Sequence, residues 1–305
     1  MKDVSNTFSV VYALDFNYVS FLKVSLKSLE YHYKSKKKLD IYIIDLGLFE
    51  YHKKEIVNII KNENIQIHWV TPDISEIAKK IPSDKSIYET SVYYWLFLSL
   101  YLPEQLDKVV MIDCDTIIKT DISKLGETDL KDFGFFAVVD SLRPCFQDGG
   151  VNNYRDLNID GNTAYFNSGV LVLSMSYWNK NNLTDKFSKC IIEHKENLLL
   201  LPDQYPFNVV LYNKIGKLDP RWNKYAFDDN IEEAFIIHYA GEKSVHYLNQ
   251  FKNEFRFFEQ LNSTDDFIKK ATFRNEGFSD DFPEMLSSFK DNSNEIEYSF
   301  IEGKL

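Results

Sequence analysis

The sequence is poor in cysteine, in basic charge and in long apolar runs, and each shortage argues against a class of protein. Its three cysteines stand at unrelated spacings with no CxxC pair, so neither a disulfide framework nor a zinc site is indicated. Reduced thiols are typical of the cytoplasm, where we expect the protein. No apolar run approaches the roughly 18 residues of a membrane span, and the stretch at 8–14 is too short for a signal peptide.

Basic residues are outnumbered by acidic ones. The 305 residues include 35 Lys and Arg against 46 Asp and Glu, a net charge of −11. Binding to a phosphate backbone needs basic surface that releases counterions, so nucleic acid is not an expected partner. The 44% of apolar residues and 15% of aromatic residues indicate an ordered globular protein, long enough to bury a full core.

Apolar strands and amphipathic helices alternate along the first 112 residues. The periodicity predicts strands at 8–14, 41–45, 65–70 and 108–112, and helices at 19–33, 50–64 and 88–101. This alternation predicts an α/β fold, a doubly wound and mostly parallel sheet flanked by helices. Ligands in such folds bind beyond the carboxyl ends of the strands, where Asp15, Asp45, Asp113 and Asp115 follow.

The second half of the chain is less regular. It is predicted to hold strands at 134–139 and 168–173, a helix at 183–195 and a short helix after Asp203. We divide the chain into a main domain over 1–250 and an extension over 251–305. The extension carries 7 basic and 12 acidic residues, net −5, so we expect it to pack on the domain or on a partner.

Two aspartates directly follow the apolar run 108–112. Asp113 and Asp115, at i and i+2 on a turning backbone, can converge on one Mg²⁺ or Mn²⁺ ion. The alternative is that they only cap the next element, but neighbouring carboxylates repel unless a cation offsets them. His238, at the end of the apolar run 234–237, is the candidate third ligand and favours Mn²⁺. Alone it would be interpreted as a core histidine.

Four ordered segments carry a family resemblance. They are VVYALDFNY at 10–18, KVVMIDCD at 108–115, YFNSGVLV at 165–172, and DQ at 203–204 ahead of LDPRWN at 218–223 and the loop at His238. Together they resemble glycosyltransferase family 8, the retaining galactosyl- and glucosyltransferases that include lipooligosaccharide galactosyltransferases and glycogenin. The similarity covers roughly residues 8 to 245. It implies a GT-A fold with a Rossmann-like mixed, mostly parallel sheet and a helical or irregular C-terminal extension.

The resemblance implies transfer of galactose or glucose from a UDP-sugar to a glycan, a lipid-linked saccharide or a glycoprotein. By it, Ala13, Asp15, Asn17 and Tyr18 would bind the uracil and ribose. Asp15 and Asn17 can also cap the following helix, and the two roles are compatible. The acceptor would place the protein at the inner membrane face at most peripherally, with no transmembrane segment, and a homo-oligomer is allowed.

The resemblance also assigns the metal site. Asp113, Asp115 and His238 would hold Mn²⁺, with Mg²⁺ as the alternative, where the ion bridges the two phosphates and neutralises the leaving diphosphate. Three neighbours join the nucleotide-sugar ligands: Cys114, Gly241 and Lys243.

The same resemblance places Asp140 and Asn167 on the donor sugar and makes Gln204 and Asp203 catalytic. An amide is a poor nucleophile, so we expect same-face attack through an oxocarbenium-like transition state that Gln204 and Asp203 stabilise. Attack by a nucleophile on the opposite face is the other route. Alone, Asp203 would be interpreted as a helix cap.

Two departures from the family pattern leave a second function open. Trp95 stands where the family has an arginine in a Tyr-x-Arg-Leu helix, and the His238 loop has Lys243 one position early and lacks Pro-Trp. Sugar or phosphate contact from that helix is therefore in question, and the closing loop is expected to differ. The alternative function is a catalytically degenerate UDP- and metal-binding protein that stabilises a partner.

Overall fold

The computed structural model describes most of the first 240 residues: 7–73, 76, 80–81, 91–130, 133–198 and 202–240. The extension over 251–305 and the candidate ligands Gly241 and Lys243 lie outside the described residues.

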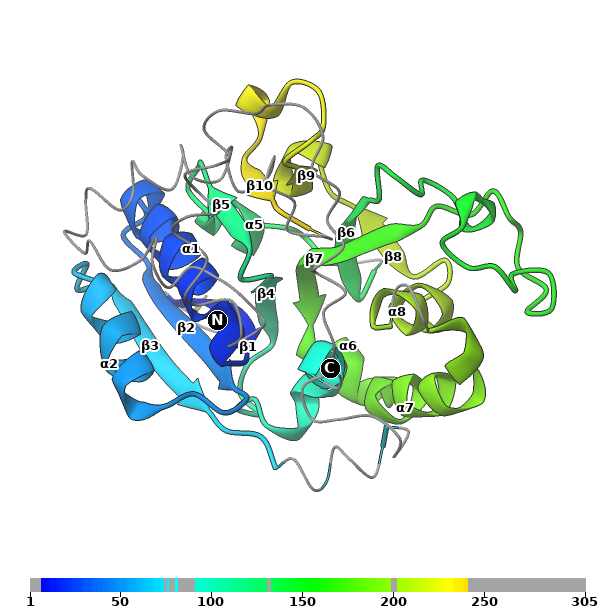
Figure 1. The fold of residues 1–305 in the computed structure, drawn as a ribbon, viewed down its shortest axis with the longest axis horizontal. Coiled ribbons are helices and arrows are strands. Elements are labelled where there is room, and N and C mark those ends of the chain that lie inside the picture. Colours follow the sequence, from blue (N-terminus) through cyan, green and yellow to red (C-terminus); the bar gives the residue numbers. More distant parts are fainter. Residues whose placement is uncertain are drawn as a thin grey trace, which may run out of the picture.

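A seven-stranded mixed sheet forms the centre of the fold (Figure 1). Across the sheet the strands are β3 (Ile65–Val70), β2 (Lys38–Asp45), β1 (Thr7–Leu14), β4 (Lys108–Ile112), β7 (Phe166–Ser174), β6 (Phe135–Val139) and β8 (Ile215–Lys217). Every neighbouring pair is parallel except the two that involve β7, which runs antiparallel to β4 and β6. The predicted mixed, mostly parallel sheet is confirmed.

Helices cover both faces of this sheet. The α-helices among the described residues are α1 (Val19–His32), α2 (Glu50–Ile59), α5 (Ser123–Gly126), α6 (Met175–Lys180), α7 (Leu183–Glu193) and α8 (Gln204–Val210). The 3-10 helices are η1 (Phe16–Tyr18), η2 (Ser91–Leu100), η3 (Phe146–Asp148), η4 (Lys195–Asn197), η5 (Pro220–Asn223) and η6 (Ile231–Glu233).

Two cores result, because successive side chains of a strand point to opposite faces. In β1, Val10 and Tyr12 pack with α1 and α2, whereas Val11 packs with η2, α6, α7 and α8. Both faces are therefore buried, which explains why the strands of the first half are near-continuous apolar runs.

Two predicted helices differ in the structure. The predicted helix 50–64 ends at Ile59, because the side chain of Glu30 accepts hydrogen bonds from the backbone N–H groups of Lys61 and Asn62 and turns the chain toward β3. The described part of the predicted helix 88–101 is η2, a 3-10 helix interrupted at Phe97 (φ −122°, ψ 18°). Aromatic residues facing the core on most of its sides leave no polar face to define an α-helical register.

A second, three-stranded sheet brings two strands from the later part of the chain to the edge of the main sheet. Its order is β5 (Thr116–Ile118), β10 (Ile236–His238) and β9 (Lys224–Tyr225). β10 pairs antiparallel with β5 so that His238 lies opposite Thr116. α1 anchors β5 through buried hydroxyls, with Ser25 Oγ 3.0 Å from Thr116 Oγ1 and the Ile118 N–H donating to Ser28 Oγ at 2.9 Å.

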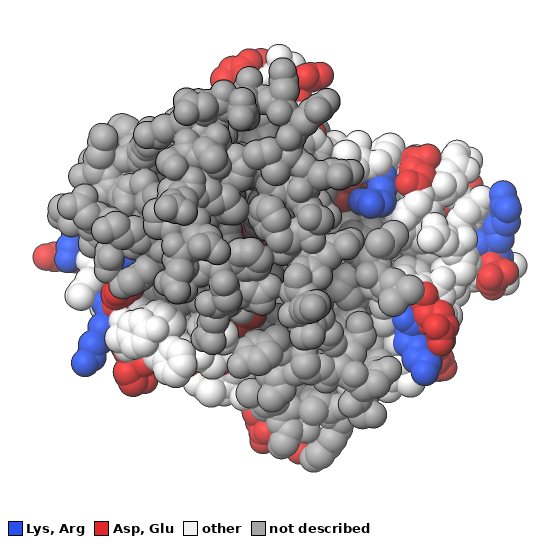
Figure 2. Space-filling view, in the orientation of Figure 1, with Lys and Arg blue, Asp and Glu red and all other residues white. Residues whose placement is uncertain are grey.

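The described helices include none that is both long and apolar enough to cross a membrane. Where the described residues are visible in Figure 2, acidic and basic side chains lie side by side rather than in an expanse of one sign.

Candidate active site

The carboxyl ends of β1, β4 and β6 meet the first residues of β7 at one edge of the main sheet. Because β7 is reversed, its start rather than its end lies here. The Asp113 N–H donates to the Gly169 carbonyl at 2.8 Å, and the Asp140 N–H donates to the Tyr165 carbonyl at 2.9 Å. Predicted site residues far apart in sequence are thereby brought to one place.

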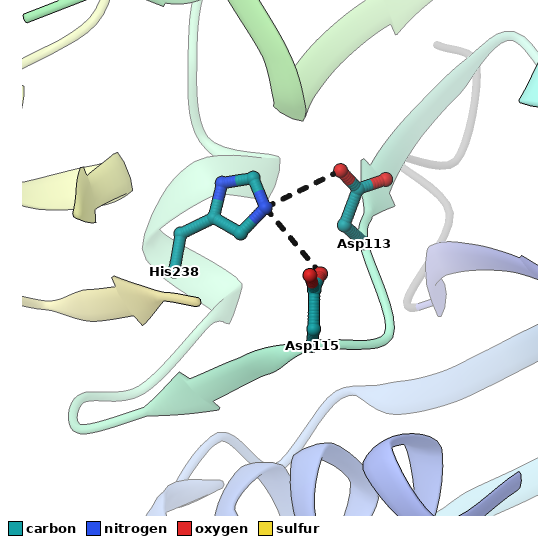
Figure 3. A group of neighbouring side chains, drawn as sticks. All are labelled: Asp113, Asp115 and His238. Atoms are coloured by element: carbon teal, nitrogen blue, oxygen red, sulfur yellow. Dashed lines mark ion pairs between the residues drawn. The ribbon is translucent and has the colours of Figure 1, made fainter. Parts of the chain in front are cut away.

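Asp113, Asp115 and His238 form a compact cluster at this edge (Figure 3). One ligand atom from each lies within 4.8 Å of the others. His238 Nε2 is 3.5 Å from Asp113 Oδ2 and 3.4 Å from Asp115 Oδ1. The small sheet causes this approach, since Asp115 directly precedes β5 and His238 ends the strand paired with it.

The orientation of the His238 ring suits a metal ligand. The imidazole is buried, and its Nδ1 lies 2.8 Å from Asn223 Oδ1, an acceptor. Nδ1 therefore donates this hydrogen bond, and Nε2 faces the carboxylates as the atom that would bind a cation. Two hard carboxylate oxygens and one imidazole nitrogen fit Mn²⁺ or Mg²⁺, and two close acidic groups need a compensating cation.

A buried polar network lies beside the cluster. Gln204 donates from Nε2 to Asp140 Oδ2 at 3.0 Å, and Tyr225 donates from its hydroxyl to the same oxygen at 2.8 Å. Asn167 donates from Nδ2 to Gln204 Oε1 at 3.0 Å and to the Tyr225 hydroxyl at 2.7 Å. Burial and the nearby Asp140 charge raise the pKa of Tyr225, so its hydroxyl stays protonated. The predicted residues Asp140, Asn167 and Gln204 thus form one network.

Asp203 precedes α8, as the capping interpretation expected, but its side chain makes no capping hydrogen bond. Its Oδ2 accepts from Trp95 Nε1 at 2.8 Å and from Ser168 Oγ at 3.0 Å. Burial raises the pKa of this carboxyl, and the two neutral donors oppose that rise. Trp95 both fills the core, edge-on to Phe207, and reaches the site through its indole N–H.

The candidate nucleotide ligands lie after β1. Asp15 caps η1 by accepting from the Asn17 N–H at 2.8 Å, so the capping role is present. Asn17 and Tyr18 are half-buried. Cys114 Sγ is 3.4 Å from the Ala13 carbonyl oxygen, which joins this loop to the acid pair. The nucleotide role of these residues stays a prediction.

Asp45 is the last residue of β2 at the same edge but has a structural task. It forms an ion pair with Lys53 at 2.6 Å and accepts from the N–H groups of Gly47 and Leu48 at 3.0 and 2.6 Å. This carboxylate therefore caps the turn into α2.

Three residues acquire roles here that the sequence did not suggest. Asn223 and Tyr225 contact His238 and Asp140, yet one lies in η5 and the other in a two-residue strand. Gly169 lies under the imidazole, since a Cβ on it would be 2.2 Å from His238 Cε1. A glycine inside the apolar run 166–174 was the available signal, because such a glycine marks a close approach.

An α/β fold whose sheet edge carries an Asp-x-Asp pair opposed by a histidine defines a class, the GT-A-like transferases. The family model described as Glycosyl transferase family 8 matches residues 9–253. The chain therefore belongs to glycosyltransferase family 8.

Curated relatives agree with this family. General stress protein A of Bacillus subtilis is 28% identical over 251 residues, which cover 76% of this chain and 85% of that protein. A lipopolysaccharide 1,2-glucosyltransferase of Escherichia coli is 26% identical over 253 residues, which cover 78% of this chain and 72% of that protein.

Solved structures share the fold. The bifunctional glycosyltransferase WbbM matches with a TM-score of 0.71 and 20% identity over 88% of this chain, which spans 52% of WbbM. The galactosyltransferase LgtC, solved with donor and acceptor sugar analogues, matches with a TM-score of 0.67 and 20% identity, covering 89% of this chain and 99% of LgtC.

Proposed function

We propose that this family 8 glycosyltransferase is a retaining hexosyltransferase that moves galactose or glucose from UDP to a glycan, lipid-linked saccharide or glycoprotein. The observation that carries the proposal is the cluster of Asp113, Asp115 and His238 beside the Gln204 network. The relatives named above include a glucosyltransferase acting on lipopolysaccharide, which supports a saccharide acceptor.

Asp113, Asp115 and His238 would hold the cation, Mn²⁺ before Mg²⁺ because of the nitrogen ligand. When bound, the cation supplies positive charge that offsets the charge of the departing diphosphate. Asp15, Asn17 and Tyr18 would hold the nucleoside, with Ala13 and Cys114 beside them. Two further ligands, Gly241 and Lys243, remain expectations.

Gln204 and Asp203 would stabilise the positive charge that develops on the sugar as its bond to phosphate breaks. Both are fixed before substrate arrives: the Gln204 amide is held by Asn167 and Asp140, and the Asp203 carboxyl by Trp95 and Ser168. Fixed dipoles need no reorganisation during the reaction, which is how such groups lower a barrier. This arrangement favours same-face transfer over attack by Gln204 itself.

The second candidate, a degenerate UDP- and metal-binding subunit, is favoured by one observation. Gln204 Oε1 already accepts from Asn167 Nδ2 and from the Ser168 N–H, at 3.0 and 3.2 Å. An oxygen with these donors has less capacity to interact with a sugar cation.

One experiment separates the two candidates. The purified full chain with Mn²⁺ is screened against UDP-, GDP- and ADP-sugars, with thermal stabilisation reporting binding and a coupled assay reporting nucleotide release. Slow release of UDP from UDP-glucose or UDP-galactose, accelerated by a saccharide acceptor, supports the transferase. Binding of UDP without any turnover supports the degenerate subunit, and binding of neither nucleotide nor metal contradicts both.

A further inference from the structure

We infer that Asn223 is a positioning residue: it holds the His238 imidazole with Nε2 toward the acid pair and, through Asn167, ties that imidazole to Gln204. The inference rests on the proposed function in taking Asp113, Asp115 and His238 as metal ligands. It assigns a role to a residue through its hydrogen bonds to His238 and Asn167.

The contacts of Asn223 are directional. Its side chain lies in η5 and is 5% exposed. Its Oδ1 faces His238 Nδ1 at 2.8 Å, and its Nδ2 donates to Asn167 Oδ1 at 2.6 Å. An amide has one acceptor end and one donor end, so the bond to Asn167 decides which end meets the histidine.

The direction of these bonds is set at the far end of the network by Asp140. Its Oδ2 accepts from both Gln204 Nε2 and the Tyr225 hydroxyl, so Gln204 turns its NH₂ group toward Asp140 and its Oε1 toward Asn167. Asn167 then meets Gln204 with Nδ2 and Asn223 with Oδ1. Asn223 is left with only Oδ1 for His238, which must therefore be protonated on Nδ1.

Two backbone groups enforce the same direction. The Ser168 N–H donates to Gln204 Oε1 at 3.2 Å, and the Gly169 N–H donates to Asn167 Oδ1 at 2.8 Å. Backbone N–H groups cannot accept, so neither amide can flip without leaving a buried donor unpaired. Four polar side chains and two backbone groups thus select one tautomer of one histidine.

That tautomer decides whether His238 can act as a ligand. With the proton on Nδ1, the nitrogen 3.4 and 3.5 Å from the two carboxylates has a lone pair available for a cation (Figure 3). With the proton on Nε2, the same nitrogen would donate to a carboxylate and could not bind metal. Removing an outer-shell partner of this kind lowers metal affinity by about 10- to 100-fold.

The experiment compares two substitutions in the full chain. Asn223→Leu removes both bonds at similar volume, whereas Asn223→Asp keeps an acceptor for His238 Nδ1 and loses the donor to Asn167. Thr184→Val is the folding control, since Thr184 is a buried hydroxyl bonded to Trp178 Nε1 at 2.9 Å on α7. Binding is measured with Mn²⁺ alone by electron paramagnetic resonance, and the imidazole tautomer by ¹⁵N NMR of metal-free protein above the titration range of histidine.

We expect Asn223→Leu to weaken Mn²⁺ binding by about 10- to 100-fold and to move His238 away from the Nδ1–H tautomer. Asn223→Asp should keep that tautomer and bind Mn²⁺ within a few-fold of the wild type, as should Thr184→Val. A folded Asn223→Leu protein with unchanged tautomer, or an Asn223→Asp protein that loses it, overturns the inference. If Asn223→Leu does not fold, the imidazole tautomer and the Mn²⁺ affinity of Asn223→Asp alone decide whether the inference stands.

The outcome is separable from that of the proposed function. A wild-type chain that takes up no Mn²⁺ would contradict the proposed metal, while the tautomer in metal-free protein would still decide the role of Asn223. A chain that binds Mn²⁺ through this arrangement but releases no UDP would leave the inference standing and favour the degenerate subunit.

Discussion

Substitution of Gly169 by alanine tests the packing of the metal site most directly. Gly169 lies in β7, and its missing side chain leaves room for the imidazole of His238. An added Cβ would lie 2.2 Å from His238 Cε1, 2.5 Å from His238 Nδ1 and 2.9 Å from Asn167 Oδ1. Ordinary contact begins at 3.4 Å, so the ring must retreat by about 1.2 Å.

That displacement should affect metal binding and turnover more than folding. A shift of about 1 Å at a reacting centre costs on the order of 100-fold in rate, or about 2.7 kcal/mol of transition-state stabilisation. Overpacking a core by one methyl group costs about 1–3 kcal/mol of folding free energy. We therefore expect a folded Gly169→Ala protein with a lower melting temperature, Mn²⁺ affinity reduced by tenfold or more, and UDP release reduced by about 100-fold.

Gly216→Ala is the matched control. Gly216 lies in β8, where an added Cβ would meet the Phe136 ring at 2.5 Å, a comparable overpacking away from His238. It should lower the melting temperature without changing Mn²⁺ affinity. Wild-type Mn²⁺ affinity in a folded Gly169→Ala protein would refute the reasoning, and so would an equal loss of affinity in both variants.

Four further predictions concern the charges and the metal of the site. Asp115→Asn removes one of the two carboxylates and should abolish both the thermal stabilisation by UDP with Mn²⁺ and any UDP release. Thermal stabilisation that persists in calorimetry, or UDP release that persists in the coupled assay, contradicts a metal role for Asp115. Because burial raises the pKa of Asp203, the folded state holds this proton more tightly than the unfolded chain. The associated stability is complete below the ordinary carboxyl pKa and is lost as pH rises through the raised pKa, so the free energy of unfolding in urea should fall as pH rises above the ordinary carboxyl range, and Asp203→Asn should remove that fall. Trp95→Phe deletes the indole N–H that lowers the pKa of Asp203. The acid limb of the pH–rate profile should therefore move to higher pH, while Mn²⁺ affinity stays constant. An acid limb that does not move contradicts the pairing of Trp95 with Asp203. Chelation of the metal by EDTA should remove UDP-dependent stabilisation and leave melting of the nucleotide-free chain unchanged, and a large loss of melting temperature without nucleotide would show a structural metal instead.

The sequence predicts well whatever depends on short-range pattern. The strands that contain Val10, Ile43 and Val110 are buried on both faces, and their unbroken apolar runs gave their positions to within a few residues. The acid pair could be placed because it follows such a strand directly. His238 was a candidate third ligand because it ends an apolar run, and the family resemblance then supported it, although nothing local joins that residue to the acid pair.

What could not be predicted depends on contacts between distant segments. The composition of β7 does not reveal its reversed direction, yet that direction places Asn167 at the edge of the sheet that carries Asp113 and Asp140. The role of Asn223 exists only after β10 has paired with β5 and delivered His238. Trp95 was recognised as a departure, but its bond to Asp203 joins residues 108 positions apart.

The reversal of β7 has a consequence for how this scaffold can diversify. Because β6 ends and β7 begins at the same edge of the sheet, the intervening chain over 140–165 joins them on the side that carries Asp140 instead of crossing to the opposite end of the strands. The Tyr205 hydroxyl in α8 donates a hydrogen bond to Asn153 Oδ1 at 2.9 Å and so holds this connection against α8. We expect insertions or deletions in this connection to alter the surroundings of Asp140 while β6 and β7 keep their pairing.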